Sequence, residues 1–382
     1  MTTVLIAVFV CCLVAVVHSY VLYPLITIRA AERRRNVDDQ PETTGPWPTV
    51  HLLMAVHNEE TVLPAKLATL DQLSYPGELV FHIASDRSTD GTDHLLAEFA
   101  ATHNCRIHRN DRRRGKPGSI NELVAGLPAD GVYLFTDASV MMRPDTATEL
   151  VRPLIDDPAI GLTDAVMIHT GVPGEGVGAL EDSYIRREVE LKVAESVLWQ
   201  HMVGPFGGCW AMRAEAYRPV PNNFLVDDFY LCMAAYENGW RGVTAQGALA
   251  YEGVGLRVGD EFRRKRRIGA GNWQNLVRFR RLWWPPVGGG LAYALFSHKV
   301  LRWWSPLLLL VGGASLLALL LLDGNYWTAV AFVGITATLS IAVPALRYFV
   351  AMNAALLLGM VDYLKGIQTN VWQPSHRNQD AG

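Results

Sequence analysis

Polar residues that could do chemistry stand directly after apolar runs of strand length in the first half of the chain. His57, Asn58 and Glu59 follow one run, Asp86 follows a second, and Asp137 follows a third. A carboxylate in such a place can accept a hydrogen bond from the imide of a pyrimidine. It can also hold a divalent cation, which prefers hard oxygen ligands and keeps substrate phosphates in its shell. Each group taken alone also fits a turn or a helix cap.

A second set of charged residues lies in the second half of the chain. Asp227 and Asp228 begin a predicted helix behind a glycine-rich turn at 204–208. An Asp that faces a glycine-lined cleft can take a proton from an acceptor hydroxyl, although helix capping explains the same pair. The basic segments 112–116 and 263–267 could stabilise a leaving diphosphate. Residues 263–267 equally fit attachment to an anionic membrane surface.

Alternating strand and helix patterns predict how these residues are positioned. Strands are expected at 50–56, 79–85, 106–108 and 133–136, and helices at 59–73, 89–101 and 119–126. This alternation predicts an α/β domain with a mostly parallel sheet and helices on both faces. In such sheets ligands bind beyond the carboxyl ends of the strands, which is where the polar groups fall.

The pattern changes at about residue 175. A strand at 160–170 precedes a long helix at 178–199, a strand follows at 209–213, and a helix starts at Asp228. Residues 258–302 then predict amphipathic helices rich in Arg and Trp, suited to lie on a membrane surface. The expected catalytic domain is therefore 50–257.

Uncharged stretches at both ends predict membrane segments. Residues 1–28 contain no Asp, Glu, Lys or Arg, which exceeds the roughly 20 residues needed to cross a bilayer. No Ala-x-Ala cleavage site follows, so this segment is expected to be an uncleaved anchor joined to a linker at 29–49.

The C-terminal region, 303–365, predicts two or three membrane-spanning or re-entrant helices. Residues 303–322 and 324–346 are uncharged and long enough to span, whereas 348–361 is only 14 residues long and also fits a re-entrant or interfacial helix. A polar tail, 366–382, ends the chain. Both edges of the soluble block are basic, which places that block on the cytoplasmic side of a plasma or inner membrane.

Composition excludes several function classes. The formal net charge is −3 over 382 residues, which argues against a nucleic-acid binder, because phosphate neutralisation needs a basic surplus. The five cysteines are scattered and form no Cys-x-x-Cys pair. Neither a disulfide framework nor a zinc site is therefore indicated.

Taken in order, the motifs between residues 50 and 285 resemble the catalytic domain of membrane-anchored family 2 glycosyltransferases. These form the cellulose-synthase-like and hyaluronan-synthase-like inverting group with a GT-A fold, a Rossmann-like α/β domain. The matching pieces are Ala55-Val-His-Asn-Glu-Glu60, Ser85-Asp-Arg-Ser-Thr-Asp-Gly-Thr92, Gly115-Lys116 with Asn121, Phe135-Thr-Asp-Ala-Ser139, Gly207-Gly-Cys-Trp-Ala-Met-Arg213, Val226-Asp-Asp-Phe-Tyr-Leu231 and Arg263-Arg-Lys-Arg-Arg-Ile-Gly-Ala-Gly271.

The resemblance implies a role for each matching residue. Asp228 would be the catalytic base and Mg²⁺ or Mn²⁺ the cofactor. The remaining expected site residues are His57, Glu59, Asp86 (for uracil) and Lys116 for the donor nucleotide, Asp137 and Ser139 in the metal-binding Asp-x-Asp motif, and Asp227, Arg264, Arg267 and Trp210 at the acceptor and diphosphate end.

Three positions depart from the family pattern. Ser139 replaces the second acid of Asp-x-Asp, which predicts weaker metal binding or more reliance on phosphate and water. In the family motif Gln-x-x-Arg-Trp, Ile268 replaces the Trp and Arg264 replaces the Gln. That Trp gives a stacking face for a sugar, so its loss favours single transfer over processive synthesis, with Trp210 or Trp273 as a substitute face. Export of a polymer would need a partner protein.

The implied function is sugar transfer, with inversion, from a nucleotide sugar to a glycan or lipid-linked acceptor at the cytoplasmic membrane face. A UDP-sugar is the expected donor, and cell-surface polysaccharide or glycolipid the expected product. The alternative is a non-catalytic membrane scaffold that keeps the fold and binds partners. Ser139 favours that alternative, whereas Asp86, Asp137 and Asp228 argue against it.

Overall fold

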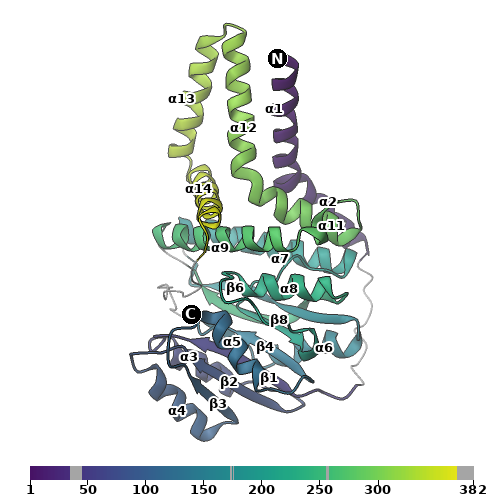
Figure 1. Cartoon of the computed structure of the whole chain (residues 1–382), viewed down its shortest axis with the longest axis vertical. Coiled ribbons are helices and arrows are strands. Elements are labelled where there is room, and N and C mark those ends of the chain that lie inside the picture. The colour runs from purple at the N-terminus through teal and green to yellow at the C-terminus, as the bar shows by residue number, and fades with distance from the viewer. Residues whose placement is uncertain (35–44, 173, 175, 255–257, 368–382) are drawn as a thin grey trace.

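One mixed sheet and a set of apolar helices make up the protein (Figure 1). The computed structural model describes residues 1–34, 45–172, 174, 176–254 and 258–367. Residues 35–44 of the predicted linker and 368–382 of the predicted polar tail lie outside the described residues.

The sheet has eight strands in the order β3-β2-β1-β4-β7-β6-β8-β5. Pairs β1/β2, β2/β3, β1/β4 and β6/β8 are parallel, whereas β7 is antiparallel to both of its neighbours and β5 is antiparallel to β8. The strands are β1 (Val50–Val56), β2 (Leu79–Ser85), β3 (Cys105–Arg109), β4 (Val132–Thr136), β5 (Val140–Met142), β6 (Ile160–Thr170), β7 (Cys209–Arg213) and β8 (Arg241–Gly253).

Helices cover both faces of this sheet, so every central strand is buried on two sides. In β1, Leu53 and Ala55 face one apolar core while Leu52 and Met54 face the other. This is the alternation that a strand between two helix layers requires. The covering helices are α3 (Leu63–Asp71), α4 (Thr92–Thr102), α5 (Gly115–Ala125), α6 (Thr146–Asp156), α7 (Val177–Trp199) and α8 (Asp227–Glu237).

The sequence did not predict β5, α6 or β8. Strand β8 lacks a clean alternation, because its pairing with β6 shifts between Ala165 and Val166, which are opposite Ala245 and Leu249. The predicted helix 59–73 begins later, at Leu63, with Pro64 in its first turn. Proline favours that position because it lacks the N–H that an interior helical residue donates.

Three helices in the described part of the chain are long and apolar enough to cross a membrane: Thr2–Arg34, Gly290–Leu322 and Pro344–Leu364. The first comprises α1 (Thr2–Val17), a π-helical stretch (His18–Leu22) and α2 (Tyr23–Arg34). The second comprises α11 (Gly290–Ala294), a second π-helical stretch (Leu295–Val300) and α12 (Leu301–Leu322).

The last two helices differ from the expected boundaries. α13 (Tyr326–Ala342) is 17 residues long, and α14 (Pro344–Leu364) begins at a proline, where Val343 is extended. The break between α13 and α14 therefore lies before Arg347, the charged residue at which the predicted membrane span 324–346 ends. In Figure 1, α1, α12 and α13 run along the long axis, while α14 is seen nearly end-on beside α9 (Val258–Arg278).

Small residues let α14 approach α9 closely. A Cβ on Gly359 would come within 2.5 Å of the Arg266 carbonyl oxygen and 2.7 Å of the Ala270 nitrogen. Arg266 also donates two hydrogen bonds to Asp362, at 2.5 and 2.7 Å. α14 is therefore fastened to the amphipathic helix α9, and whether it spans the membrane or is re-entrant stays a prediction.

A buried ionic network joins α7 to the membrane helices. Glu188 on α7 pairs with His298 at 2.9 Å, with Lys299 at 3.2 Å and with Arg302. His298 also bonds Glu195 at 2.7 Å, and Glu195 accepts a hydrogen bond from the Tyr23 hydroxyl at 2.8 Å. Since these side chains are buried, the network holds the sheet domain in one position against α2 and α12.

Candidate active site

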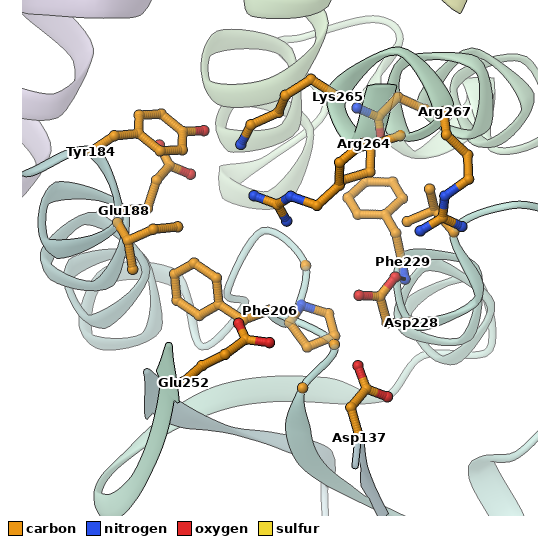
Figure 2. Close-up of a pocket in the computed structure, with 18 of the residues that line it drawn as sticks. Asp137, Tyr184, Glu188, Phe206, Asp228, Phe229, Glu252, Arg264, Lys265 and Arg267 are labelled. Atoms are coloured by element: carbon orange, nitrogen blue, oxygen red, sulfur yellow. Dashed lines mark hydrogen bonds between the residues drawn. The ribbon is translucent and has the colours of Figure 1, made fainter. Parts of the chain in front are cut away.

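A cavity of about 1090 Å³ lies between the carboxyl edge of the sheet and α9. Figure 2 shows Asp137 and Asp228 on one wall, with Arg264, Lys265 and Arg267 of α9 reaching in from the opposite side. The predicted site residues that line it are Glu59, Lys116, Asp137, Ser139, Asp227, Asp228, Arg264 and Arg267. The sheet topology therefore brings together residues that lie far apart in the sequence.

Asp228 sits in the first turn of α8, pressed against the glycine-rich turn. Its Oδ1 accepts a hydrogen bond from the Phe229 N–H at 2.6 Å. Gly207 has a φ of +83°, and a Cβ there would collide with Asp228 Oδ2. Burial, with the negative charge of Asp227 next in importance, raises the pKa of Asp228 to about 7. A carboxyl with such a pKa is suited to proton transfer near neutral pH.

Asp137 follows β4 and is held by the same turn. Its N–H donates to the Gly208 carbonyl oxygen at 3.1 Å. Lys116 Nζ donates to Asp137 Oδ1 at 2.5 Å and lies 3.5 Å from the Gly207 carbonyl oxygen. Burial would lower the pKa of Lys116, but Asp137 and Asp227 outweigh burial and raise it. Lys116 is therefore a permanent cation beside the acids.

The two arginines of α9 that the sequence predicted for the site differ in how they are held. Arg264 donates to Glu181 and, from its Nε at 2.9 Å, to Glu261. Arg267 donates to the Leu225 carbonyl oxygen at 3.2 Å, and no carboxylate among the described residues lies within ion-pair distance of it. Arg267 thus brings more uncompensated charge to the cavity than Arg264.

Asp86 is fully buried and organises the basic loop. Its carboxylate accepts hydrogen bonds from Asn110 at 2.9 Å, from Arg113 at 3.0 Å, and from the N–H groups of Arg114 and Gly115 at 2.7 and 3.0 Å. Burial would raise the pKa of Asp86, but these donors outweigh it and the pKa is lowered. Asp86 therefore fixes the loop that carries Lys116, and its contact with uracil stays a prediction.

The other two predicted nucleotide residues lie next to this loop. His57 Nδ1 bonds the Asp86 carbonyl oxygen at 2.9 Å, and burial lowers the pKa of His57. His57 is buried and does not line the cavity, whereas Glu59 does. The Glu59 N–H donates to the Thr92 hydroxyl at 2.9 Å, at the start of α4.

The prediction that Trp210 offers an aromatic face to a sugar is wrong. Trp210 lies in β7 with 2% of its surface exposed, and it stacks on Phe135 with ring centroids 4.3 Å apart. Helices cover both faces of β7, so the ring is core packing. Trp273 is also buried and packs against Trp304.

Sequence reasoning missed Glu252, which comes from β8 and lines the cavity. The Ser139 hydroxyl donates to Glu252 Oε1 at 3.1 Å across 113 residues of sequence. No sequence motif links the two residues. Only the pairing of β5 with β8 brings them together.

The donor set fits a divalent cation that is shared with a substrate. Within the described residues no three His, Cys, Asp or Glu side chains converge as a closed metal cage. Seven acids nevertheless line the cavity, and Asp137, Asp227, Asp228 and Glu252 are among them. Mg²⁺ is often bound by one or two carboxylates together with substrate phosphates, and such a site needs no closed cage.

Acids at the carboxyl edge of an α/β sheet, beside a large cavity, are the arrangement that the sequence predicted for a glycosyltransferase of the GT-A fold. The model of "Glycosyl transferase family 2" matches residues 52–220, and that of "Glycosyl transferase family group 2" matches residues 165–356. The second match alone spans half of the chain, so the protein belongs to family 2 of the glycosyltransferases.

Relatives and a solved structure agree with this assignment. The chain is 25% identical over 280 residues to a beta-monoglucosyldiacylglycerol synthase of Synechocystis, and the matched region covers 69% of this chain and 56% of that protein. It is 32% identical over 126 residues to the Nostoc protein of the same name, covering 32% and 26%. The chain thus spans about half the length of the Synechocystis protein and a smaller part of the Nostoc protein.

The fold also matches the mannosyltransferase PcManGT from Pyrobaculum calidifontis, solved in complex with GDP-Man and Mn²⁺. The TM-score is 0.72 at 23% identity, and the match covers 94% of this chain and 99% of the other. The match includes the apolar helices as well as the sheet domain, because it extends over nearly the whole of both chains.

Proposed function

We propose that the protein transfers a hexose, with inversion, from a nucleotide sugar to the hydroxyl of a membrane lipid. The donor diphosphate would lie against Lys116 and Arg267, and Asp228 would accept the proton of the attacking hydroxyl. One displacement needs one base, so no second carboxylate nucleophile is required.

The observation that carries this proposal is the extent of the cavity. The cavity that contains Asp137 and Asp228 is also lined by Tyr20 of the N-terminal anchor, Arg302 of α12 and Phe349 of α14. The cavity therefore extends from the acids to the membrane helices, with both aromatic and charged side chains along its wall. An acceptor that stays anchored in the bilayer could reach Asp228 by this route.

The names of the relatives support a lipid acceptor and a hexosyl donor. The Synechocystis and Nostoc relatives are monoglucosyldiacylglycerol synthases, and PcManGT was solved with GDP-Man and Mn²⁺. A divalent cation bound near Asp137 would stabilise the negative charge of the departing diphosphate. A UDP-hexose, with glucose first, is the donor that we propose.

The basic residues support a catalytic domain on the cytoplasmic side. Arg33 and Arg34 end α2, and Arg280 and Arg281 lie in α10 (Arg280–Trp283) at the other edge of the domain. The turn between α12 and α13, at the far end of the hairpin in Figure 1, has only one charged residue, Asp323. This distribution follows the positive-inside rule.

The test uses the full chain in mixed micelles that contain diacylglycerol and Mn²⁺, with labelled UDP-glucose or GDP-mannose. We expect wild-type protein to label the lipid. Asp228→Asn should reduce transfer by at least about 100-fold, because removal of a general base costs that much or more. Donor binding should be retained, since Asn keeps the size of the side chain.

Asp130→Asn is the matched control, because Asp130 is exposed and does not line the cavity. It should transfer sugar like wild type. Full turnover by Asp228→Asn would show that the assigned base is wrong. Transfer to a soluble oligosaccharide and not to lipid would overturn the lipid acceptor.

A further inference from the structure

A carboxylate from β8 occupies the neighbourhood of the acid that the Asp-x-Asp motif lacks. Ser139 stands where the family motif has its second acid, and its hydroxyl donates to Glu252 Oε1 at 3.1 Å. Both residues line the same cavity as Asp137. The chain therefore has two carboxylates at this wall, one from the motif and one from a distant strand.

The backbone fixes this arrangement. Ser139 directly precedes β5, and β5 pairs with β8 so that Val140 lies opposite Glu252 and Met141 opposite Tyr251. The registered ladder sets the position of Glu252 relative to Ser139, so the contact does not depend on a flexible loop. Figure 2 shows the Glu252 and Asp137 side chains entering the cavity from the same strand-lined wall.

The negative charge at this wall exceeds what Lys116 alone can neutralise, since Asp137, Asp227 and Asp228 all act on this one lysine. Lys116 offsets part of the negative charge of this wall, since its Nζ lies 2.5 Å from Asp137 Oδ1. Arg264 and Lys265, on the opposite wall, are engaged by acids of α7 and α9. Hard carboxylate oxygens beside a diphosphate site suit Mg²⁺ or Mn²⁺. The acids that line the cavity are Glu59, Asp137, Glu188, Asp227, Asp228, Glu252 and Asp260.

We infer that Glu252 replaces the missing second acid, so that the metal is held by Asp137 and Glu252 together with the donor diphosphate. Ser139 orients the Glu252 carboxylate through its hydroxyl. This inference rests on the proposed function, because the diphosphate completes the ligand set. It predicts that an acid introduced at position 139 can take over the role of the carboxylate at position 252.

The test measures Mn²⁺ affinity, by the electron paramagnetic resonance signal of free Mn²⁺, for the full chain with UDP and in parallel with GDP. Glu252→Gln keeps a hydrogen-bond acceptor for Ser139 but removes the charge. We expect it to weaken Mn²⁺ binding by about tenfold or more. Ser139→Asp placed in the Glu252→Gln protein should restore the affinity, because it returns the carboxylate to the motif.

Glu78→Gln is the control, since Glu78 lies outside the cavity and accepts a hydrogen bond from Thr49. It should bind Mn²⁺ like wild type. Unchanged Mn²⁺ affinity in Glu252→Gln would overturn the inference, and so would a loss of affinity that Ser139→Asp does not restore. Sugar transfer by the wild-type protein would still support the proposed function in either case. A wild-type protein that binds neither nucleotide would instead defeat the proposed function.

Discussion

The burial that makes Asp228 a suitable proton acceptor also costs the folded protein stability. Its carboxylate is held between the Gly207 backbone and the Phe229 N–H, next to Asp227. Burial and the neighbouring negative charge penalise the ionised form, which raises the pKa to about 7. An ordinary Asp, with a pKa near 4, would be a far weaker base.

The raised pKa predicts a pH-dependent gain in stability for Asp228→Asn. The folded-state pKa of about 7 exceeds the ordinary value of 3.8, so the stability from this group is present below pH 3.8 and is lost as the pH rises through 7. Asn cannot ionise. The unfolding free energy of the variant should therefore exceed that of wild type by more at pH 8 than at pH 5. The two differences should themselves differ by roughly 1–3 kcal/mol.

Thermal unfolding of the purified, metal-free chain in detergent at the two pH values checks this prediction. The exposed Asp130→Asn is again the control and should show the same small difference at both pH values. An equal gain for Asp228→Asn at pH 5 and pH 8 would contradict a raised pKa.

At this scale the sequence predicted residue types better than side-chain directions. Asp137 and Asp228 could be selected because the motifs around them resemble, in order and spacing, those of family 2 glycosyltransferases, whereas each acid alone also fits a turn or a helix cap. Trp210 could not be assigned, because whether a ring in β7 faces a ligand depends on what covers the sheet. Helices cover both faces there, so Trp210 is buried against Phe135.

The glycine-rich turn is the element that brings the site together. Its carbonyl and Cα atoms contact Asp137, Lys116 and Asp228 from one side. Gly207 has a φ of +83°, a conformation that residues other than glycine adopt at a cost, and the Asp228 carboxylate lies where a Cβ would be.

Gly207→Ala should therefore displace Asp228 and reduce turnover by about 100-fold, because small misplacements of a catalytic group have effects of that size. Gly239→Ala is a matched control, since Gly239 has a φ of +85° but nothing within 4 Å of an added Cβ. Both variants should lose about 1–2 kcal/mol of stability from backbone strain.

Transfer rates and thermal unfolding of the two variants separate strain from collision. Equal loss of activity in both would show that the close approach to Asp228 is unimportant. Retained activity in Gly239→Ala with loss in Gly207→Ala is the expected result.

Elements with regular patterns could be predicted, and irregular ones could not. The ranges of β1, β2 and β7 follow from their apolar runs, because each is short and buried on both faces. β8 has a pairing shift at Ala245 and Leu249 and exposed Gln246 and Gly247 within it. That interruption hides its period, and with it the position of Glu252.

At the scale of the whole molecule, the ionic network on α7 fixes the sheet domain to the membrane helices. Glu188→Ala would leave Lys299, His298 and Arg302 without their shared carboxylate. Breaking a buried ion pair by removing one partner costs about 3–5 kcal/mol. We expect a loss of unfolding free energy of that size.

Glu190→Ala on the same helix is the control, because Glu190 is exposed, and its effect should stay within about 0.5 kcal/mol. Thermal unfolding in detergent measures both variants. Equal stability of the two would mean that the network does not hold the domain to the membrane helices.

The membrane arrangement was predictable in outline only. Uncharged length identified the N-terminal anchor and α12, since crossing a bilayer needs a minimum number of apolar residues. It placed the last break at Arg347, whereas the helix actually breaks at Pro344. The Arg266–Asp362 pair and the close packing at Gly359, which fasten α14 to α9, are long-range contacts that no local pattern reports.

Phe349 and Asn353 of α14 line the same cavity as Asp228. Under the proposed function, the lipid acceptor would therefore enter the cavity, and the product leave it, past α14 from the same leaflet of the bilayer. Turnover would then follow the surface density of acceptor molecules and their lateral diffusion, whatever the volume of the surrounding water. Each finished headgroup would return to the leaflet that supplied it, so the enzyme would alter the composition of one side of the bilayer, one molecule at a time.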